Sequence, residues 1–326
     1  MKILLTADTA GGVWTYAVEL ATELQRCGHE LLVAAMGREE RAADGLDVRF
    51  LDCALEWAED PSGEVERAGE WLLRLSDRFE PDLVHVNGYA HAALDWRVPV
   101  VCVSHSDVAS WFAAVRGTTL PPTWNRYRGA VEAGLAAADV VVAPTQAQLR
   151  SLERHYRFET ERVVIPNGRR PLEHLPKQAL VAAAGRAWDE AKGIANLERV
   201  SVGWPVEVAD GSRTAAETEA LLARAAIFAA PARYEPFGLA ALEAATTGAA
   251  LVLGDIDSLR EVWGDAAIYI ANERELERAL CRLIGDGELR RKLGELARLR
   301  ARRFSPGRMV DAYLRLYERL PALAAA

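Results

Sequence analysis

Short apolar runs alternate with segments of helical periodicity along almost the whole chain. In the first half the runs cover residues 2–6, 31–35, 48–51, 82–86, 99–103, 140–143 and 163–165. Between them apolar residues recur every three or four positions, as they do from Val13 to Leu24. The runs 82–86 and 99–103 are mostly apolar and do not alternate with polar residues, which is typical of strands buried on both faces. This alternation predicts βαβ units and parallel sheets.

The second half repeats the rhythm. Strands are expected at 180–184, 206–209, 226–229, 250–253 and 267–270, and helices at 214–224, 238–246, 258–262, 273–284 and 288–302. Two such halves predict an α/β protein with two facing Rossmann-like domains. The Pro-, Gly- and Arg-rich stretch 166–177 is the expected linker, and Ser305-Pro306 is expected to begin a last helix.

Composition excludes several classes of protein. The chain has 326 residues, half of them hydrophobic, which is enough for two domains with their own cores. No apolar run reaches the roughly 18–20 residues that span a bilayer, and the N-terminal apolar stretch is too short for a signal peptide. The net charge of −8 argues against nucleic acid as a partner.

The four cysteines, at positions 27, 53, 102 and 281, form no CxxC pair. Neither a zinc site nor a disulfide framework is expected, and free thiols of a cytoplasmic protein are predicted. Lysine is rare, because 35 of the 39 basic residues are arginine.

The most informative stretch is EPFGLAALE, from Glu235 to Glu243. Glu235 lies in the loop after the strand at 226–229, and Glu243 lies within the next helix. A helix start offers free backbone N–H groups to a diphosphate, and carboxylates beside it accept hydrogen bonds from sugar hydroxyls. Acidic residues at a helix start are also favoured by the helix dipole alone, which is the structural alternative.

This stretch resembles the E-x7-E signature of family 4 glycosyltransferases, which have the GT-B fold, and the resemblance extends over essentially the whole chain. It implies that Glu235 holds donor-sugar hydroxyls, that Glu243 holds the nucleotide ribose, and that the backbone of Phe237, Gly238 and Leu239 meets the phosphates and sugar. It also implies domains 1–172 for the acceptor and 173–304 for the donor. The helix 305–326 is expected to cross back onto the first domain.

Further motifs match the family in order. Arg186 and Lys192, after a second-domain strand, are expected to clamp the donor diphosphate, since fixed cations stabilise a departing diphosphate. Gly11 and Gly12 follow the first strand and are expected to lie against donor and acceptor. His105 follows the strand at 99–103, and the resemblance places it near the reacting carbon, although a lone histidine is more often structural.

Asp255-Ile256-Asp257 spells DxD, a metal motif of another glycosyltransferase fold. Asp257 is interpreted as a turn or cap residue before a helix, and neither a cofactor nor a metal is expected. The segment 290–308 carries eight basic residues and one acidic residue. A solvated helix face is the first interpretation, and peripheral contact with an anionic membrane is the second.

The function expected from these residues is retaining, metal-independent transfer of a hexose from a UDP- or GDP-sugar to an acceptor hydroxyl. The acceptor stays open among lipid, saccharide and small molecule. Residues 197–213 are shorter than the corresponding region of the family's pattern, which helps to hold the nucleotide base. A non-catalytic nucleotide-sugar binder or partner subunit is therefore the alternative, and a nucleotide-sugar epimerase is a weaker one.

Overall fold

The computed structural model describes residues 1–61 and 63–323, which form two compact units. Unit 1 comprises residues 1–113 and 118–168 together with the segment that begins at Pro306. Unit 2 comprises residues 114–117 and 169–305. The boundary predicted after residue 172 falls slightly later in the chain than this division. No helix in the described part of the chain is both long and apolar enough to cross a membrane.

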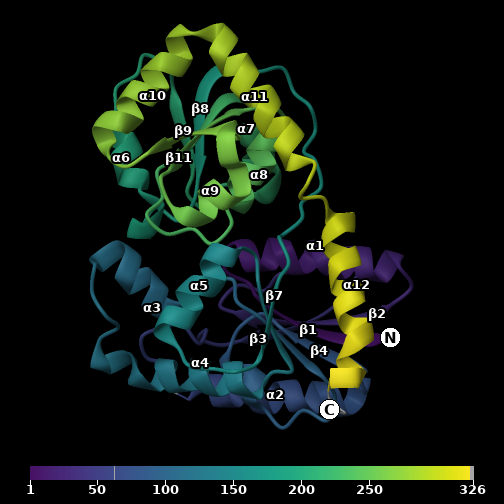
Figure 1. The fold of residues 1–326 in the computed structure, drawn as a ribbon. Coiled ribbons are helices and arrows are strands. Elements are labelled where there is room, and N and C mark those ends of the chain that lie inside the picture. Colours follow the sequence, from purple (N-terminus) through teal and green to yellow (C-terminus); the bar gives the residue numbers. More distant parts are fainter. Residues whose placement is uncertain (62, 324–326) are drawn as a thin grey trace. The chain divides into compact units, whose positions relative to one another are not determined.

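The described residues of unit 1 build a seven-stranded parallel sheet in the order β3-β2-β1-β4-β5-β6-β7. Figure 1 labels β1, β2, β3, β4 and β7 of this sheet. Its strands are β1 (Lys2–Asp8), β2 (Glu30–Gly37), β3 (Asp47–Asp52), β4 (Leu83–Val86), β5 (Val100–Val103), β6 (Val140–Ala143) and β7 (Glu161–Val164). The strand order changes direction between β1 and β4, and ligands of such sheets bind at the carboxyl ends of the strands beside that point.

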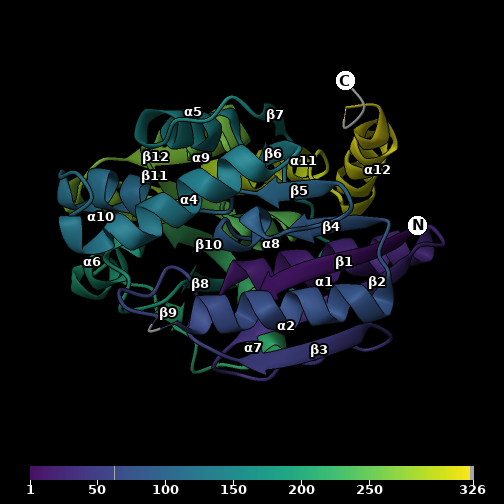
Figure 2. The ribbon, with the colours of Figure 1, turned by 90° about the horizontal axis from the view of Figure 1, so that it is seen from below.

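Helices cover both faces of this sheet. They are α1 (Gly12–Arg26), α2 (Glu64–Phe79), η1 (Ala90–Ala93), α3 (Val108–Trp111), a π-helical turn η2 (Phe112–Arg116), η3 (Pro122–Trp124), α4 (Asn125–Ala137), α5 (Gln146–His155) and α12 (Pro306–Leu323). One core joins α2 and α4 to the face of β4 that carries Val84 and Val86. Figure 2 shows α2 (blue) lying along the sheet beside β1 and β2.

The last helix, α12, packs against α1 in unit 1 (Figure 1, yellow and purple). Its Tyr313 and Tyr317 are buried, and both reach the face of β4 opposite Val84 and Val86. Because side chains alternate across a strand, His85 points to that face and meets them. The helix at the end of the chain thus completes the core of unit 1.

The described residues of unit 2 build a five-stranded parallel sheet in the order β12-β11-β10-β8-β9. Its strands are β8 (Gln178–Ala184), β9 (Val206–Ala209), β10 (Ala225–Ala230), β11 (Ala250–Gly254) and β12 (Ala267–Ile270). Its helices are η4 (Glu190–Lys192), α6 (Ile194–Arg199), α7 (Ala215–Arg224), α8 (Leu239–Thr246), α9 (Asp257–Trp263), η5 (Gly264–Ala266), α10 (Glu273–Gly285) and α11 (Gly287–Ala301). They pack on both faces of the sheet.

The region that the sequence marks as short is compact. Residues 210–214 lead from β9 directly into α7, whose N-terminus is closed by a capping box between Thr214 and Glu217. β9 is the edge strand and pairs only with β8 among the strands of the described residues. No further strand therefore follows β9 before α7.

The interpretation of Asp257 as a turn or cap residue is wrong. Asp257 is the first residue of α9, the cap position belongs to Ile256, and no side chain caps the helix. Ser258 donates instead to the carbonyl of Glu235 at 2.5 Å. Asp255 of the same DxD stretch pairs with Arg260, which lowers the pKa of that carboxyl group below its ordinary value.

Candidate functional site

The sheet of unit 2 brings Lys192 and Glu235 together. Lys192 follows β8 and Glu235 follows β10, and these neighbouring strands flank the point where the strand order changes direction. Their carboxyl ends meet at one edge of the sheet, so the two loops lie close. Lys192 Nζ donates to Glu235 Oε2 at 2.8 Å, and both side chains are about four-fifths buried.

Gly238 fixes the other oxygen of the same carboxylate. It precedes α8 with a φ of 91°, a left-handed conformation that favours glycine. Its backbone N–H donates to Glu235 Oε1 at 3.1 Å. Glu235 is thus held by a cation on one oxygen and by the helix start on the other.

A small pocket opens between these groups. Described residues that line it are Ala184, Lys192, Ile194, Phe228, Ala230, Ala232, Glu235, Gly238, Ala240, Ala241 and Leu259. The wall is apolar apart from Lys192 and Glu235. An ion pair with an apolar surround places strong, oriented charge where water is scarce, which is how electrostatic catalysis gains its effect.

The neighbouring predicted residues take different places. Phe237 is buried and packs edge-on against Phe304 at 5.5 Å between ring centroids, so its side chain belongs to the core. Leu239, the first residue of α8, also packs against this core. Only the backbone of this segment is available for a ligand.

Arg186 does not line this pocket. Its Nη2 donates to Asp189 Oδ2 at 2.9 Å, and its guanidinium lies 4.8 Å from the ring centroid of Trp188. Asp189 is buried and also accepts a hydrogen bond from the backbone of Ala191, so it shapes the loop that carries Lys192. Sequence reasoning missed Asp189, although an acidic residue just before a helical turn is a capping signal.

Glu243 lies apart from the Lys192–Glu235 pair and has a partner that sequence reasoning missed. Arg169 Nε donates to Glu243 Oε1 at 2.7 Å, and Arg169 Nη2 donates to Glu219 Oε1 at 2.7 Å. Arg169 is buried between the two acids. It comes from the stretch read as a linker, and nothing in its local pattern marks a buried ion pair.

In unit 1 the remaining predicted residues follow the carboxyl ends of β1 and β5. Gly11 caps α1 with a φ of 70°, and Gly12 begins the helix. One turn later, the Tyr16 ring meets the His105 ring edge-on, with 4.5 Å between centroids. The first turn of α1 therefore links the glycine pair to His105.

A hydrogen-bond chain fixes the His105 ring. Asn87 Nδ2 donates to the carbonyl of Thr6 at 2.7 Å, which leaves Asn87 Oδ1 as the acceptor for His105 Nε2 at 2.8 Å. Nε2 therefore carries the proton, and Nδ1 is the acceptor atom of the ring. Desolvation lowers the pKa of His105 to about 3, so the ring is neutral at physiological pH.

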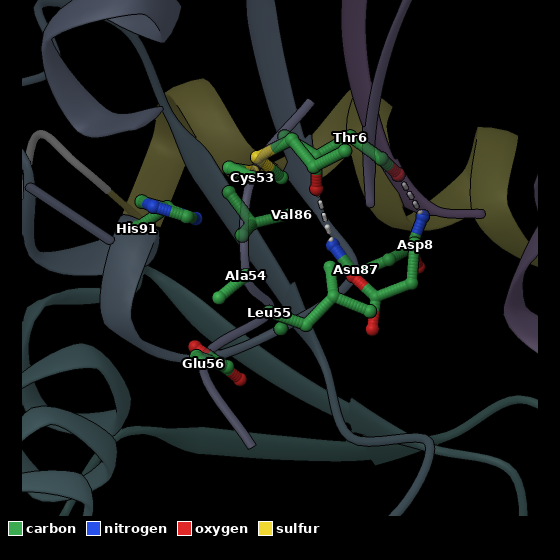
Figure 3. A pocket seen from close by; sticks show the side chains of 11 residues that line it. Thr6, Asp8, Cys53, Ala54, Leu55, Glu56, Val86, Asn87 and His91 are labelled. Carbon is green, nitrogen blue, oxygen red and sulfur yellow. Dashed lines mark hydrogen bonds between the residues drawn. The ribbon is translucent and has the colours of Figure 1, made fainter. Parts of the chain in front are cut away.

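A second pocket in unit 1 lies beside Asn87 (Figure 3). It sits where β1, β2, β3 and β4 end. Described residues that line it are Thr6, Asp8, Met36, Cys53, Ala54, Leu55, Glu56, Val86, Asn87, Gly88 and His91.

The remaining motifs are engaged within the fold. In the basic segment, Arg290 donates to the carbonyl of Leu283 at the end of α10, and Arg300 donates to that of Val262 in α9. Arg298 pairs with Glu295 along α11. These contacts account for three of the basic side chains, and membrane contact stays a prediction. All four cysteines are free thiols, with Cys53 and Cys102 buried.

Comparison with known proteins agrees with this architecture. Residues 10–171 match the sequence family described as "Glycosyltransferase Family 4", and residues 211–300 match "Glycosyl transferases group 1". A D-inositol 3-phosphate glycosyltransferase of Xylanimonas cellulosilytica is 26% identical, over 96% of this chain and 94% of its own length.

Solved structures show the same fold at lower identity. Sucrose-phosphate synthase from Thermosynechococcus elongatus superposes with a TM-score of 0.79 at 18% identity, covering 99% of both chains. Anabaena HepE in complex with UDP-glucose gives 0.73 at 16% identity, over 98% of this chain and 99% of its own. WaaG, a glycosyltransferase of lipopolysaccharide biosynthesis, gives 0.71 at 15%, over 96% and 99%. The chain belongs to family 4 of the glycosyltransferases and is an enzyme of that class with the GT-B fold.

Proposed function

We propose that this glycosyltransferase moves a hexose from a UDP- or GDP-sugar to an acceptor hydroxyl with retention of configuration and without a metal. The observation that carries the proposal is the Lys192–Glu235 pair beside the start of α8. The donor binds to unit 2 and the acceptor to unit 1. Three structures of one similar protein, Anabaena HepE, hold UDP or UDP-glucose and support a uridine nucleotide as the first donor to test.

The pair matches what departure of a nucleoside diphosphate requires. As the bond between the sugar C1 and the phosphate oxygen breaks, negative charge grows on the diphosphate. The Lys192 ammonium and the free N–H groups at the start of α8 stabilise that charge, which is the task a metal performs in other enzymes. Arg186 supplies a further cation on the same loop when its guanidinium exchanges Asp189 for a phosphate of the donor.

Glu235 orients the sugar. A carboxylate offers about four lone-pair positions, so an oxygen that accepts from Lys192 or Gly238 can also accept from a sugar hydroxyl. The fixed ion pair sets the direction of that acceptor before the donor arrives. Preorganisation of this kind raises the rate by removing reorientation from the reaction step.

The proposed transfer needs no nucleophile from the protein. The acceptor oxygen forms the new bond to C1 on the face from which the diphosphate leaves, and the acceptor proton passes to the departing phosphate oxygen. His105 is neutral with Nδ1 as an acceptor atom, so it orients a hydroxyl near the reacting carbon and carries no charge into the step.

The test is release of nucleoside diphosphate from UDP-glucose and GDP-mannose, each with a panel of acceptors, with and without EDTA. We expect turnover of one donor, resistance to EDTA, and a product whose anomeric configuration matches the donor by NMR. Lys192→Met should abolish most of the turnover while the circular dichroism spectrum stays unchanged. Lys292→Met, on the exposed face of α11, is the matched control and should keep the wild-type rate.

Three results would contradict the proposal. An inverted product would exclude retention, and complete loss of activity in EDTA that is restored by a divalent cation would exclude metal independence. Donor binding without turnover for any acceptor in the panel would favour a nucleotide-sugar-binding protein.

A further inference from the structure

The pocket of unit 1 has an unusual balance of charge for a site that could receive a phosphorylated acceptor. Asp8 and Glu56 lie on its wall, together with the neutral polar groups of Thr6 and Asn87 (Figure 3). Among the described residues that line it, none is lysine or arginine. The chemistry of the wall suits hydroxyl groups and opposes anions.

Both carboxylates are held in place by donors from the protein. Trp57 Nε1 donates to Asp8 Oδ2 at 3.0 Å. Glu56 Oε2 accepts from the backbone N–H of Ala90 at 2.7 Å, and Glu56 Oε1 accepts from that of Tyr89 at 2.9 Å. These hydrogen bonds fix the orientation of both carboxylates within the pocket.

Two arginines near the pocket, Arg38 and Arg67, bond acceptors outside its lining. The charges of Arg38 and Arg67 reach Cys53 on the pocket wall, where each lowers the pKa of the thiol against the larger effect of burial. Arg38 bonds Asp52 at 3.0 Å and Glu64 at 2.9 Å, while Arg67 donates to the carbonyl of Asp52 at 2.6 Å. These contacts hold both guanidinium groups on neighbouring acceptors, outside the pocket lining.

The pocket is also joined to His105. Asn87 lines the pocket, and its Oδ1 accepts from His105 Nε2 at 2.8 Å. Asp8 lies three residues before Gly11, which caps α1. A hydroxyl group in the pocket is thus one side chain away from the histidine and beside the glycine turn that the family resemblance places against donor and acceptor.

We propose that this pocket is where the acceptor binds, and that it selects an uncharged, hydroxyl-bearing acceptor, a free sugar or polyol, over a phosphorylated one. The inference rests on the proposed function and adds the class of acceptor to it. It separates this chain from the relative named for D-inositol 3-phosphate. A phosphate group placed against Asp8 and Glu56 meets like charges, and His91, whose ring bonds the carbonyl of Val65 at 3.0 Å, is the basic side chain among the described lining residues.

The experiment compares matched pairs of acceptors on the full-length protein. The pairs are myo-inositol with inositol 3-phosphate, glucose with glucose 6-phosphate, and fructose with fructose 6-phosphate. Diphosphate release measures turnover, and saturation-transfer NMR with the protein alone measures acceptor binding without a donor. Calorimetry with UDP-glucose and GDP-mannose measures the donor separately, so a failed donor assignment is distinguished from a failed acceptor class.

We expect the uncharged acceptor of at least one pair to bind. The phosphorylated acceptor of that pair should bind or react at least about tenfold less well, a difference of about 1.4 kcal/mol in free energy. Asp8→Asn removes one charge and keeps an oxygen for Trp57, and it should reduce the ratio of affinity or rate between the uncharged and the phosphorylated acceptor. Asp77→Asn, an exposed acid in the last turn of α2, is the matched control and should leave it unchanged.

Stronger binding or faster turnover of a phosphorylated member would overturn the inference. So would binding of none of the uncharged members, or an Asp8→Asn variant that changes both members of a pair equally. The comparison within each pair uses the wild-type protein, so it decides the question even if Asp8→Asn fails to fold.

Discussion

His85 should make unit 1 sensitive to acid. The side chain is completely buried between Tyr16 of α1 and Tyr317 of α12. Tyr16 donates its hydroxyl proton to Tyr313 at 2.6 Å, so His85 Nε2 must donate to the Tyr16 oxygen and Nδ1 must accept from Tyr317. The ring is therefore neutral with both nitrogens engaged, and a second proton would displace the hydrogen bond at Nδ1.

The size of the effect follows from the pKa. Desolvation, aided by the nearby His105, lowers the pKa of His85 from 6.5 to about 3. An unfolded chain takes up this proton below about pH 6.5 whereas the folded chain does not, so stability falls as the pH falls through that window. Between pH 7 and pH 5 the loss from His85 is about 2 kcal/mol, and it continues to grow until about pH 3.

Hydrogen exchange of the β4 amides, corrected for its intrinsic pH dependence, measures the free energy of opening in the core of unit 1. We expect the wild-type value to fall between pH 7 and pH 5. In His85→Gln, whose side chain donates and accepts without titrating, the fall should be about 2 kcal/mol smaller. His174→Gln, at an exposed position, should behave like the wild type.

His105 is present in both the wild type and His85→Gln, so the difference between their losses of stability from pH 7 to pH 5 reports on His85. A His85→Gln variant that loses as much stability as the wild type between these pH values would refute the buried, neutral assignment.

Three further predictions concern single side chains. Lys192→Met should lower kcat about 100- to 1,000-fold, as loss of one group that stabilises developing charge does elsewhere, and initial rates of diphosphate release that match the wild type would contradict this. Arg169→Met leaves two partly buried carboxylates facing each other and should cost about 3 kcal/mol in urea denaturation, a loss that an unchanged midpoint would rule out. Gly134→Ala places a Cβ 1.9 Å from the Tyr89 carbonyl oxygen and should destabilise unit 1. In Gly129→Ala, on the same helix, the new Cβ meets nothing within 4 Å, so the variant should be stabilised by up to about 1 kcal/mol and melt at a higher temperature. Equal melting temperatures for the two variants would contradict the packing of α4.

The strands are predictable because each contains a short cluster of apolar residues between segments of helical periodicity. The runs 140–143, 206–209 and 267–270 coincide with β6, β9 and β12, and the others differ by a few residues at their ends. Ends are less certain because hydrogen bonding extends a strand past its apolar residues. β1 continues to Asp8, which pairs with Met36 of β2 although its side chain is acidic.

The meeting of Lys192 and Glu235 is partly predictable. Both follow strands of one parallel sheet, so their loops share an edge once β8 and β10 are neighbours. The 2.8 Å contact between them depends on loop geometry that no periodicity encodes.

Arg169 and the tyrosines of α12 could not be predicted as partners. Arg169 lies in a stretch whose composition is typical of a linker, and its acids come from helices 50 and 74 residues later. Tyr313 lies on an apolar stripe that predicts burial without indicating against what. Such contacts depend on how the whole unit packs. A local sequence pattern therefore indicates that a side chain is buried but does not identify the residue that it contacts.

The position of α12 has a consequence for synthesis. Apart from the short segment 114–117, unit 2 is made between Gly168 and Pro306, before the helix that completes the core of unit 1 leaves the ribosome. Domains generally fold as units in the order of translation. Here unit 2 can finish folding first, while unit 1 keeps Tyr16 and His85 uncovered until Tyr313 and Tyr317 have been made. Interrupted translation after residue 305 would thus yield a folded second unit attached to an unfinished first one.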